Sequence, residues 1–276
     1  MELRQVLNIA HRGASSLAPE NTLAAAQLAL TGGADMWEVD VGLTADGQPI
    51  LLHDDTLART SNVMELFPQR QPWWLHQFSL AEIRQLDFGS WYVETDPFGQ
   101  IAAGQVAAAD FAAYAGERAP ILAEALAFTR ANDWRINVEI KDLSGTVGDA
   151  HIVERVVQLV EQMKMIDRTL VSSFNHQYLA RVRMMNPNLA TAALVEEAVA
   201  DPQQLLGRLA AQAYHPPASA IQPQQIADLR QAGYEVNVWT VDEVETMRRL
   251  IAAGVSGIIT NFPHRLKQVS RLEQAE

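Results

Sequence analysis

Two carboxylates stand two positions apart in a stretch that predicts a β-strand, a spacing that could build a metal site. Residues 36–44 read Met-Trp-Glu-Val-Asp-Val-Gly-Leu-Thr. Alternate side chains of a strand share a face, so Glu38 and Asp40 would lie side by side. Because like charges repel, two carboxylates that point inward from such a strand require a cation beside them.

A predicted hairpin brings a histidine to the same place. Asp46-Gly47, between two apolar runs, is a strong signal for a tight turn. Folding the chain back at this turn would return His53 to a position roughly opposite Val39, beside both carboxylates. One local element could therefore deliver two metal ligands and a titratable imidazole.

Further polar residues fall at the ends of other predicted strands. His11 and Arg12 follow the first apolar run of the chain. Asn137, Glu139 and Lys141 share one face of a later predicted strand by the same alternation. Whether these groups meet depends on the elements that carry them.

Alternating strands and helices form the predicted frame. Predicted strands cover residues 6–10, 36–44 with its hairpin, 135–141, 169–173, 191–195, 213–215, 236–240 and 257–261. Predicted helices cover residues 19–30, 121–131, 152–163, 178–185, 224–232 and 242–253. Counting the hairpin once, there are eight strands. This pattern predicts an α/β fold, a TIM (β/α)8 barrel whose chemistry sits at the C-terminal ends of its strands.

Residues from about 55 to 120 interrupt the alternation. Ser79 and Glu82 have the spacing of a capping box, which predicts a short helix. We therefore expect one domain, residues 1–276, with a small, partly helical insertion after the His53 hairpin. The aromatic residues of the insertion could wall a substrate pocket or form a small core of their own; they are Phe67, Trp73, Trp74, Phe78, Trp91, Tyr92 and Phe98.

Each polar residue, taken alone, has a purely structural explanation. A single histidine at a strand end is usually hydrogen-bonded within the fold, and Glu139 and Lys141 could form a simple ion pair. Trp239, on a predicted strand, could belong to the core. Three carboxylates, two imidazoles and two cations at one barrel mouth are nevertheless hard to explain as packing.

Together these groups suit metal-assisted cleavage of a phosphodiester. Three carboxylates favour a hard divalent cation, Ca²⁺ or Mg²⁺, over zinc. The metal, Arg12 and Lys141 would form a binding site for a phosphate group. Two histidines could divide proton transfer, one activating a nucleophile and one protonating the leaving oxygen.

The chain resembles the glycerophosphodiester phosphodiesterase family in short motifs that stand in the family's order. They are His11-Arg12-Gly13, Pro19-Glu20-Asn21-Thr22, Glu38-x-Asp40, Asp46-Gly47, His53-Asp54, Arg59-Thr60, Glu139-x-Lys141, Ser173-Phe174, Trp239-Thr240-Val241 and Gly257-Ile258-Ile259-Thr260. The resemblance covers nearly the whole barrel. It implies hydrolysis of glycerophosphodiesters to an alcohol and sn-glycerol 3-phosphate with one divalent cation.

The resemblance also implies a role for each matching site residue. Glu38, Asp40 and Glu139 would be metal ligands, and His11 and His53 the acid and base. Arg12 and Lys141 would contact the phosphate, and Trp239 would lie near the glycerol; these complete the expected set.

Three features depart from the family pattern. Asn261 stands where the family often has Asp after the last strand, which affects support for the site rather than a ligand. Val138 replaces a residue that is often smaller, with little expected consequence. The insertion, here about residues 67–118, is longer than usual and leaves the substrate preference open.

Two other functions compete with this interpretation. The aromatic insertion could receive an acyl chain, which would make the protein a lysophospholipase D-type enzyme acting on lysophospholipids. A catalytically inactive barrel that only binds ligands is a further alternative, although the positions for metal, phosphate and proton chemistry are all present.

The composition restricts the expected location and binding partners of the protein. The absence of cysteine excludes disulfides and thiolate chemistry, and favours a cytoplasmic location. The net charge of −12 opposes binding to nucleic acid or anionic lipid. No secretory signal, membrane span or stable membrane anchor is expected. The oligomeric state and the choice between Ca²⁺ and Mg²⁺ stay open.

Overall fold

Eight parallel strands close into a barrel in the computed structural model, which describes residues 6–273. Residues 1–5, where the sequence predicts no secretory signal, lie outside the described residues. The strands are β1 (Leu7–Ala10), β2 (Met36–Leu43), β4 (Ile136–Ile140), β5 (Thr169–Ser173), β6 (Ala190–Leu194), β7 (Ala213–His215), β8 (Glu235–Val238) and β9 (Gly257–Thr260). Each pairs with the next, and β9 and β2 both pair with β1, which closes the barrel. The predicted TIM barrel is confirmed.

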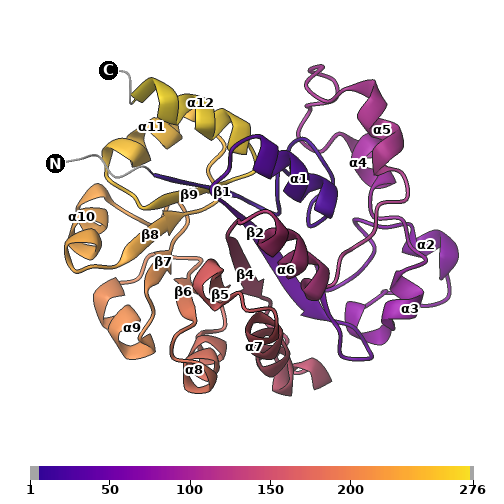
Figure 1. Ribbon diagram of the computed structural model, residues 1–276, viewed down its shortest axis with the longest axis horizontal. Helices are drawn as coiled ribbons and strands as arrows, with labels where there is room; N and C mark the ends of the chain where they lie inside the picture. Colours follow the sequence, from indigo (N-terminus) through magenta and orange to yellow (C-terminus); the bar gives the residue numbers. More distant parts are fainter. Residues whose placement is uncertain (1–5, 274–276) are drawn as a thin grey trace.

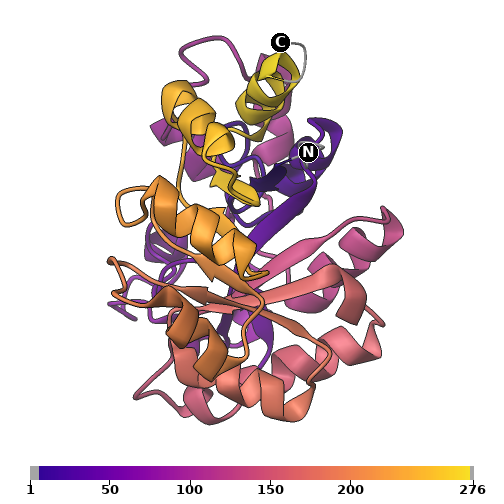
Figure 2. The same cartoon turned by 90° about the vertical axis from the view of Figure 1, so that its left-hand side faces the viewer.

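Helices lie outside the strands (Figures 1 and 2). They are α1 (Leu23–Thr31), α6 (Leu122–Ala131), α7 (Ile152–Gln162), α8 (His176–Met185), α9 (Pro202–Leu209), α10 (Pro223–Gln231), α11 (Val244–Ala252) and α12 (Pro263–Glu273), with the 3-10 turns η2 (Val147–Ala150) and η3 (Ile166–Arg168). The sequence predicts all of these α-helices except α9 and α12. Both bury only a few apolar side chains in an otherwise polar stretch that contains Gln or Arg.

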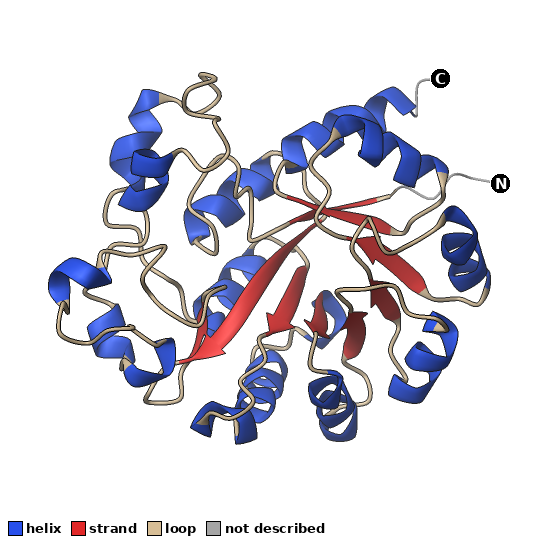
Figure 3. Ribbon diagram, turned by 180° about the vertical axis from the view of Figure 1, so that it is seen from behind, coloured by secondary structure: helices blue, strands red, loops and turns tan. Residues whose placement is uncertain are grey.

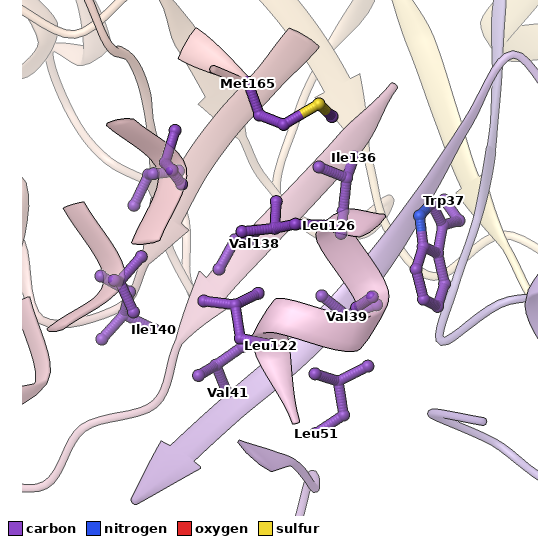
Figure 4. Packing of buried hydrophobic residues seen from close by; sticks show 14 of the residues in the cluster. Trp37, Val39, Val41, Leu51, Leu122, Leu126, Ile136, Val138, Ile140 and Met165 are labelled. Atoms are coloured by element: carbon purple, nitrogen blue, oxygen red, sulfur yellow. The ribbon is translucent and has the colours of Figure 1, made fainter. Parts of the chain in front are cut away.

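The alternation of β2 and β4 sends one set of side chains out toward the helices and the other into the barrel. The outward set packs beneath α6 (Figure 4); it comprises Trp37, Val39, Val41, Ile136, Val138 and Ile140, against Leu122 and Leu126. Burial of each large apolar side chain stabilises the fold by roughly 1.5–3 kcal/mol. A register slip of one residue would turn this set into the barrel and set the carboxylates against α6, so core packing also fixes the carboxylates on the inner face.

The predicted hairpin is present. Strand β3 (Pro49–Leu51) pairs antiparallel with β2, with Leu51 opposite Val41. The strand pairing ends at Leu51, one further hydrogen bond joins the backbone N–H of Leu52 to the carbonyl of Asp40 at 3.0 Å, and His53 lies in the bend that follows, so the predicted position opposite Val39 stays a prediction. Gly47 has φ +74°, a backbone conformation that glycine adopts without strain.

Residues 55–120 form the predicted insertion, a group of short helices to one side of the barrel (Figures 1 and 3). Its elements are α2 (Val63–Leu66), η1 (Leu75–Gln77), α3 (Leu80–Ile83), α4 (Ser90–Thr95) and α5 (Ala108–Tyr114). The capping box of Ser79 and Glu82 is formed at the start of α3. Hydroxyl groups of Tyr92 and Tyr114 donate to backbone carbonyls beside α1 and tie the insertion to the barrel.

Most of the aromatic residues of the insertion build its own core. Phe78 and Tyr92 are fully buried, whereas Trp74 borders a cavity at the barrel mouth. The insertion thus has a small core of its own, and Trp74 is left to line a cavity. Among residues 6–273, no helix is both long and apolar enough to cross a membrane.

Candidate active site

The predicted site residues meet at the C-terminal ends of the strands. Seven of them line one cavity of about 90 Å³: His11, Arg12, Glu38, His53, Glu139, Lys141 and Trp239. The eighth, Asp40, is 1% exposed and contacts two of these lining residues, Arg12 and Lys141. The fold thus brings the predicted residues together from β2, β4 and the segments that follow β1, β3, β4 and β8.

Three carboxylates form the floor of this site. In the parallel pairing of β2 and β4, Asp40 is the partner of Glu139. Glu38, Asp40 and Glu139 each offer an oxygen atom, and these atoms lie within 4.8 Å of one another. Oε1 of Glu38 is buried without a hydrogen-bond partner among the described residues. Such an oxygen-rich cluster with a free ligand atom could hold a hard divalent cation.

The pKa values of the three carboxyl groups also indicate a site for a cation. Burial, together with the neighbouring carboxylates of Asp40 and Glu139, raises the pKa of Glu38 well above its usual value. Burial and Asp40 also raise the pKa of Glu139. For Asp40, burial opposes ionisation, but Arg12 and Lys141 hold its pKa below the usual range. The side chains present leave negative charge only partly compensated, which a bound cation would offset.

Two basic side chains border the carboxylates. The Nζ atom of Lys141 lies 2.9 Å from Glu139 Oε1 and 3.4 Å from Asp40 Oδ1. The Nε atom of Arg12 lies 3.2 Å from Asp40 Oδ2, and its backbone N–H donates to Glu38 Oε2 at 3.0 Å. Arg12 has φ +57°, and at Gly13, with φ +82°, a Cβ atom would come within 2.7 Å of Ala25. This tight turn directs Arg12 into the site.

Asn21 holds Asp40 in place, a role that the sequence analysis did not assign. Its Nδ2 donates to Asp40 Oδ2 at 2.9 Å, and its Oδ1 accepts from the backbone N–H of Asp40 at 3.2 Å. Asn21 lies before α1, 19 residues from Asp40 along the chain. Only its place in the Pro-Glu-Asn-Thr motif could have indicated it.

His11 faces the carboxylates with one ring nitrogen and a neutral amide with the other. Nε2 lies 4.0 Å from Glu38 Oε2, and Nδ1 lies 2.7 Å from Asn261 Oδ1. Burial and the neighbouring Arg12 lower the pKa of His11 to about 4. The imidazole is therefore neutral at physiological pH.

His53 has a charged partner instead. Its Nδ1 lies 2.8 Å from Asp54 Oδ1, and Arg59 holds Asp54 with contacts of 2.6 and 2.9 Å. Arg59 also binds Glu20, which contacts Arg12 at 3.0 Å. This network links the surroundings of His53 to Arg12. Its members occur in the family motifs, but the sequence alone did not show that they touch.

A larger cavity, of about 270 Å³, adjoins the first and shares His53 and Lys141 with it. Its floor is largely apolar, formed by Leu43, Leu52, Leu75 and Leu143. The insertion contributes Asp55, Trp74 and His76, and the segment after β4 contributes Asp142 and Ser144. The insertion therefore shapes one of the two spaces that open at His53.

Trp239 forms part of the opposite wall of the smaller cavity. Its indole N–H donates to the carbonyl of His215 at 2.8 Å, and Phe174 packs edge-on against it at 5.5 Å. The indole is thus fixed in orientation, with part of its surface left for a ligand. Trp239 is half-buried rather than a core residue.

Nearly the whole chain is similar to proteins of one family. Residues 11–265 match the model of the glycerophosphoryl diester phosphodiesterase family. The chain is 35% identical to a glycerophosphodiester phosphodiesterase of Caldanaerobacter subterraneus, over 97% of this chain and 98% of the relative. It is 30% identical to one of Bacillus altitudinis, over 94% and 96%. Among solved structures, a phosphodiesterase of Oleispira antarctica in complex with the product sn-glycerol-3-phosphate is 29% identical, with a TM-score of 0.81 over 97% of this chain and 96% of that one.

Proposed function

The chain belongs to the glycerophosphoryl diester phosphodiesterase family and is a phosphoric diester hydrolase, and from this premise we propose how its site acts. It cleaves glycerophosphodiesters into an alcohol and sn-glycerol 3-phosphate, the product bound by the Oleispira relative. One observation carries the proposal: three buried carboxylates, with a ligand oxygen left free, stand beside two cations and two histidines in one cavity. We also propose that residues 1–276 act as one domain, with residues 55–120 as its insertion.

Glu38, Asp40 and Glu139 would hold one Ca²⁺ or Mg²⁺ ion. When bound, the ion supplies positive charge against the phosphate oxygens. Arg12 and Lys141 bind the same phosphate group from the sides, because each already lies within 3.4 Å of a carboxylate of the cluster. The glycerol moiety rests against Trp239, which Phe174 keeps in place.

The two histidines divide proton transfer according to their partners. His11, held by a neutral amide, accepts the proton of the nucleophile at Nε2 as the new oxygen–phosphorus bond forms. The bond from phosphorus to the leaving alcohol breaks, and its oxygen takes a proton from Nε2 of His53. The Asp54 carboxylate lies against Nδ1 of His53 and orients the ring, which leaves Nε2 as the nitrogen that faces the leaving oxygen.

The leaving alcohol occupies the larger cavity, since that space opens at His53 and Lys141. The smaller cavity, of about 90 Å³, suits a glycerol moiety better than one that carries an acyl chain. This size favours glycerophosphodiesters over the alternative of a lysophospholipase D-type reaction.

A substrate panel tests the proposal. Purified protein is given glycerophosphocholine, glycerophosphoglycerol or lysophosphatidylcholine, each with Mg²⁺, and the products are measured. We expect release of glycerol 3-phosphate from the two water-soluble diesters and little cleavage of the lysophospholipid. Preferential cleavage of lysophosphatidylcholine would favour the alternative, and no cleavage of any diester would refute the proposed function.

A further inference from the structure

A chain of hydrogen bonds runs around the barrel rim from Asp242 through Asn261 to His11. The Nδ2 group of Asn261 donates to Asp242 Oδ2 at 2.7 Å, and its Oδ1 lies 2.7 Å from His11 Nδ1. The three residues follow β8, β9 and β1, which are consecutive strands of the barrel. Residues 250 positions apart in the sequence are therefore neighbours at the rim.

Asp242 determines which way the amide of Asn261 faces. An ionised carboxylate offers only acceptors, so the amide must present its NH₂ group to Asp242. The reversed amide would set two acceptor oxygens 2.7 Å apart. The carbonyl oxygen of Asn261 is consequently directed at His11, where Ser15 Oγ also lies 2.9 Å from it.

The orientation of this amide in turn determines where the proton of neutral His11 resides. An amide oxygen is only an acceptor, so Nδ1 of His11 must carry the hydrogen. The lone pair then lies on Nε2, the atom that faces Glu38. We propose that Asp242 and Asn261 are positioning residues that lock His11 in the Nδ1–H tautomer and so keep Nε2 ready to accept a proton. This inference rests on the base role of His11 in the proposed function.

The pair is itself firmly held. Asp242 Oδ1 accepts from the backbone N–H of Asn261 at 2.9 Å and from the Thr260 hydroxyl at 3.0 Å. Arg265 donates to the backbone carbonyl of Asp242 at 2.7 Å. Neither Asp242 nor Asn261 lines either of the two cavities at the barrel mouth. They act on the reaction only through His11.

Ring nitrogen NMR of ¹⁵N-histidine protein reads the tautomer directly, without any dependence on activity. In the wild-type protein with Mg²⁺, we expect His11 to be neutral with its hydrogen on Nδ1. In Asn261→Leu, which removes the acceptor, we expect a mixture of tautomers. A wild-type His11 with its hydrogen on Nε2, or an unchanged tautomer in Asn261→Leu, would overturn the inference.

Steady-state kinetics distinguishes a positioning role of Asn261 from a general effect on the stability of the fold. Asn261→Leu should lower kcat by about 10- to 100-fold with little change in KM, by analogy with loss of the partner that orients a metal-binding histidine. The matched control is Asn186→Leu, since Asn186 also donates its amide to a carboxylate, Glu161 at 2.7 Å, but its partners do not include His11. An equal loss of kcat in the control would attribute the effect to folding.

An exchange of the two side chains gives the sharpest test. Asn261→Asp alone sets a second carboxylate against Asp242 and should lower kcat. The double variant Asp242→Asn/Asn261→Asp restores a donor facing an acceptor, and residue 261 still accepts from His11, so kcat should recover at least tenfold over the single variant. A double variant no better than the single one would contradict the proposal. If no variant, nor the wild type, hydrolyses any diester while the Nδ1–H tautomer is observed, the proposed function fails and the tautomer lock stands.

Discussion

Asp40 and Glu139 are direct partners across the parallel pair β2–β4, and Lys141 contacts both carboxylates. Parallel pairing sets residues of two strands level at the barrel mouth, whatever their separation in the sequence. Glu38, two residues before Asp40, completes the cluster on the same face. The carboxylate cluster thus follows from strand register and not from loop conformation.

Glu38→Gln should have opposite effects on activity and on stability. The variant loses a ligand, so release of glycerol 3-phosphate should fall to background. In the absence of metal, however, burial and two neighbouring carboxylates penalise the charge of Glu38, so the variant should unfold at a higher temperature than the wild type in chelator. Activity assays and thermal unfolding with EDTA measure the two effects. Glu154→Gln, on the exposed face of α7, is the control. A lower unfolding temperature in Glu38→Gln would show that the carboxylates do not repel one another as described.

His11→Ala and His53→Ala should retain binding of glycerol 3-phosphate but lose turnover. General acid or base catalysis typically contributes about 10²- to 10⁴-fold in rate, so losses of that size are expected. The double variant should be little worse than the poorer single variant, because either loss already removes the concerted route. Calorimetry with glycerol 3-phosphate and steady-state kinetics measure both properties. Near-normal turnover in both single variants would mean that neither histidine transfers a proton.

Trp74→Ala should change which alcohol the enzyme releases most readily. Trp74 lines the larger cavity, where we place the leaving alcohol. Removing the indole should shift the ratio of kcat/KM between glycerophosphocholine and glycerophosphoglycerol several-fold. Phe111→Ala, in the same insertion but outside that cavity, should leave the ratio as it is. An unchanged ratio in Trp74→Ala would exclude the insertion from substrate selection.

Point substitutions test the role of the insertion in substrate selection better than its removal would. In the structure, Leu52 beside His53 and Ala25 of α1 belong to apolar clusters that the insertion completes. Excision would expose both clusters and disturb the hairpin that carries His53.

His215 should make the protein less stable in mild acid. It is fully buried on β7, and burial lowers its pKa to about 3, against 6.5 for an exposed histidine. Below pH 6.5 His215 is protonated in the unfolded chain, whereas in the folded chain it stays neutral down to about pH 3. Because the unfolded state then binds more protons, the free energy of unfolding decreases as the pH falls. The slope from this one group is at most about 1.4 kcal/mol per pH unit. Urea unfolding between about pH 5 and 7.5, with chelator present, should give a shallower pH dependence for His215→Gln; parallel curves for the two proteins would contradict this.

The sequence predicted the barrel and the grouping of the three carboxylates because both depend on alternation. Period-two patterns on β2 and β4 identify the inner face, and the same pattern names Glu38, Asp40 and Glu139. Supporting contacts escaped prediction because they join distant segments. Glu20 and Arg59 are 39 residues apart, and no local pattern indicates that they meet. Helix α9 was not predicted, although Asp201 caps it and Pro202 begins it, signals that the sequence itself carries.

The most direct test of the central claim is a titration of metal into chelator-treated protein, with glycerol 3-phosphate release measured in parallel. The arrangement of Glu38, Asp40 and Glu139 predicts one Mg²⁺ or Ca²⁺ ion per chain and turnover of glycerophosphocholine that rises in proportion to the bound metal. Full turnover with no divalent cation bound would contradict the claim that this carboxylate cluster works as a metal site.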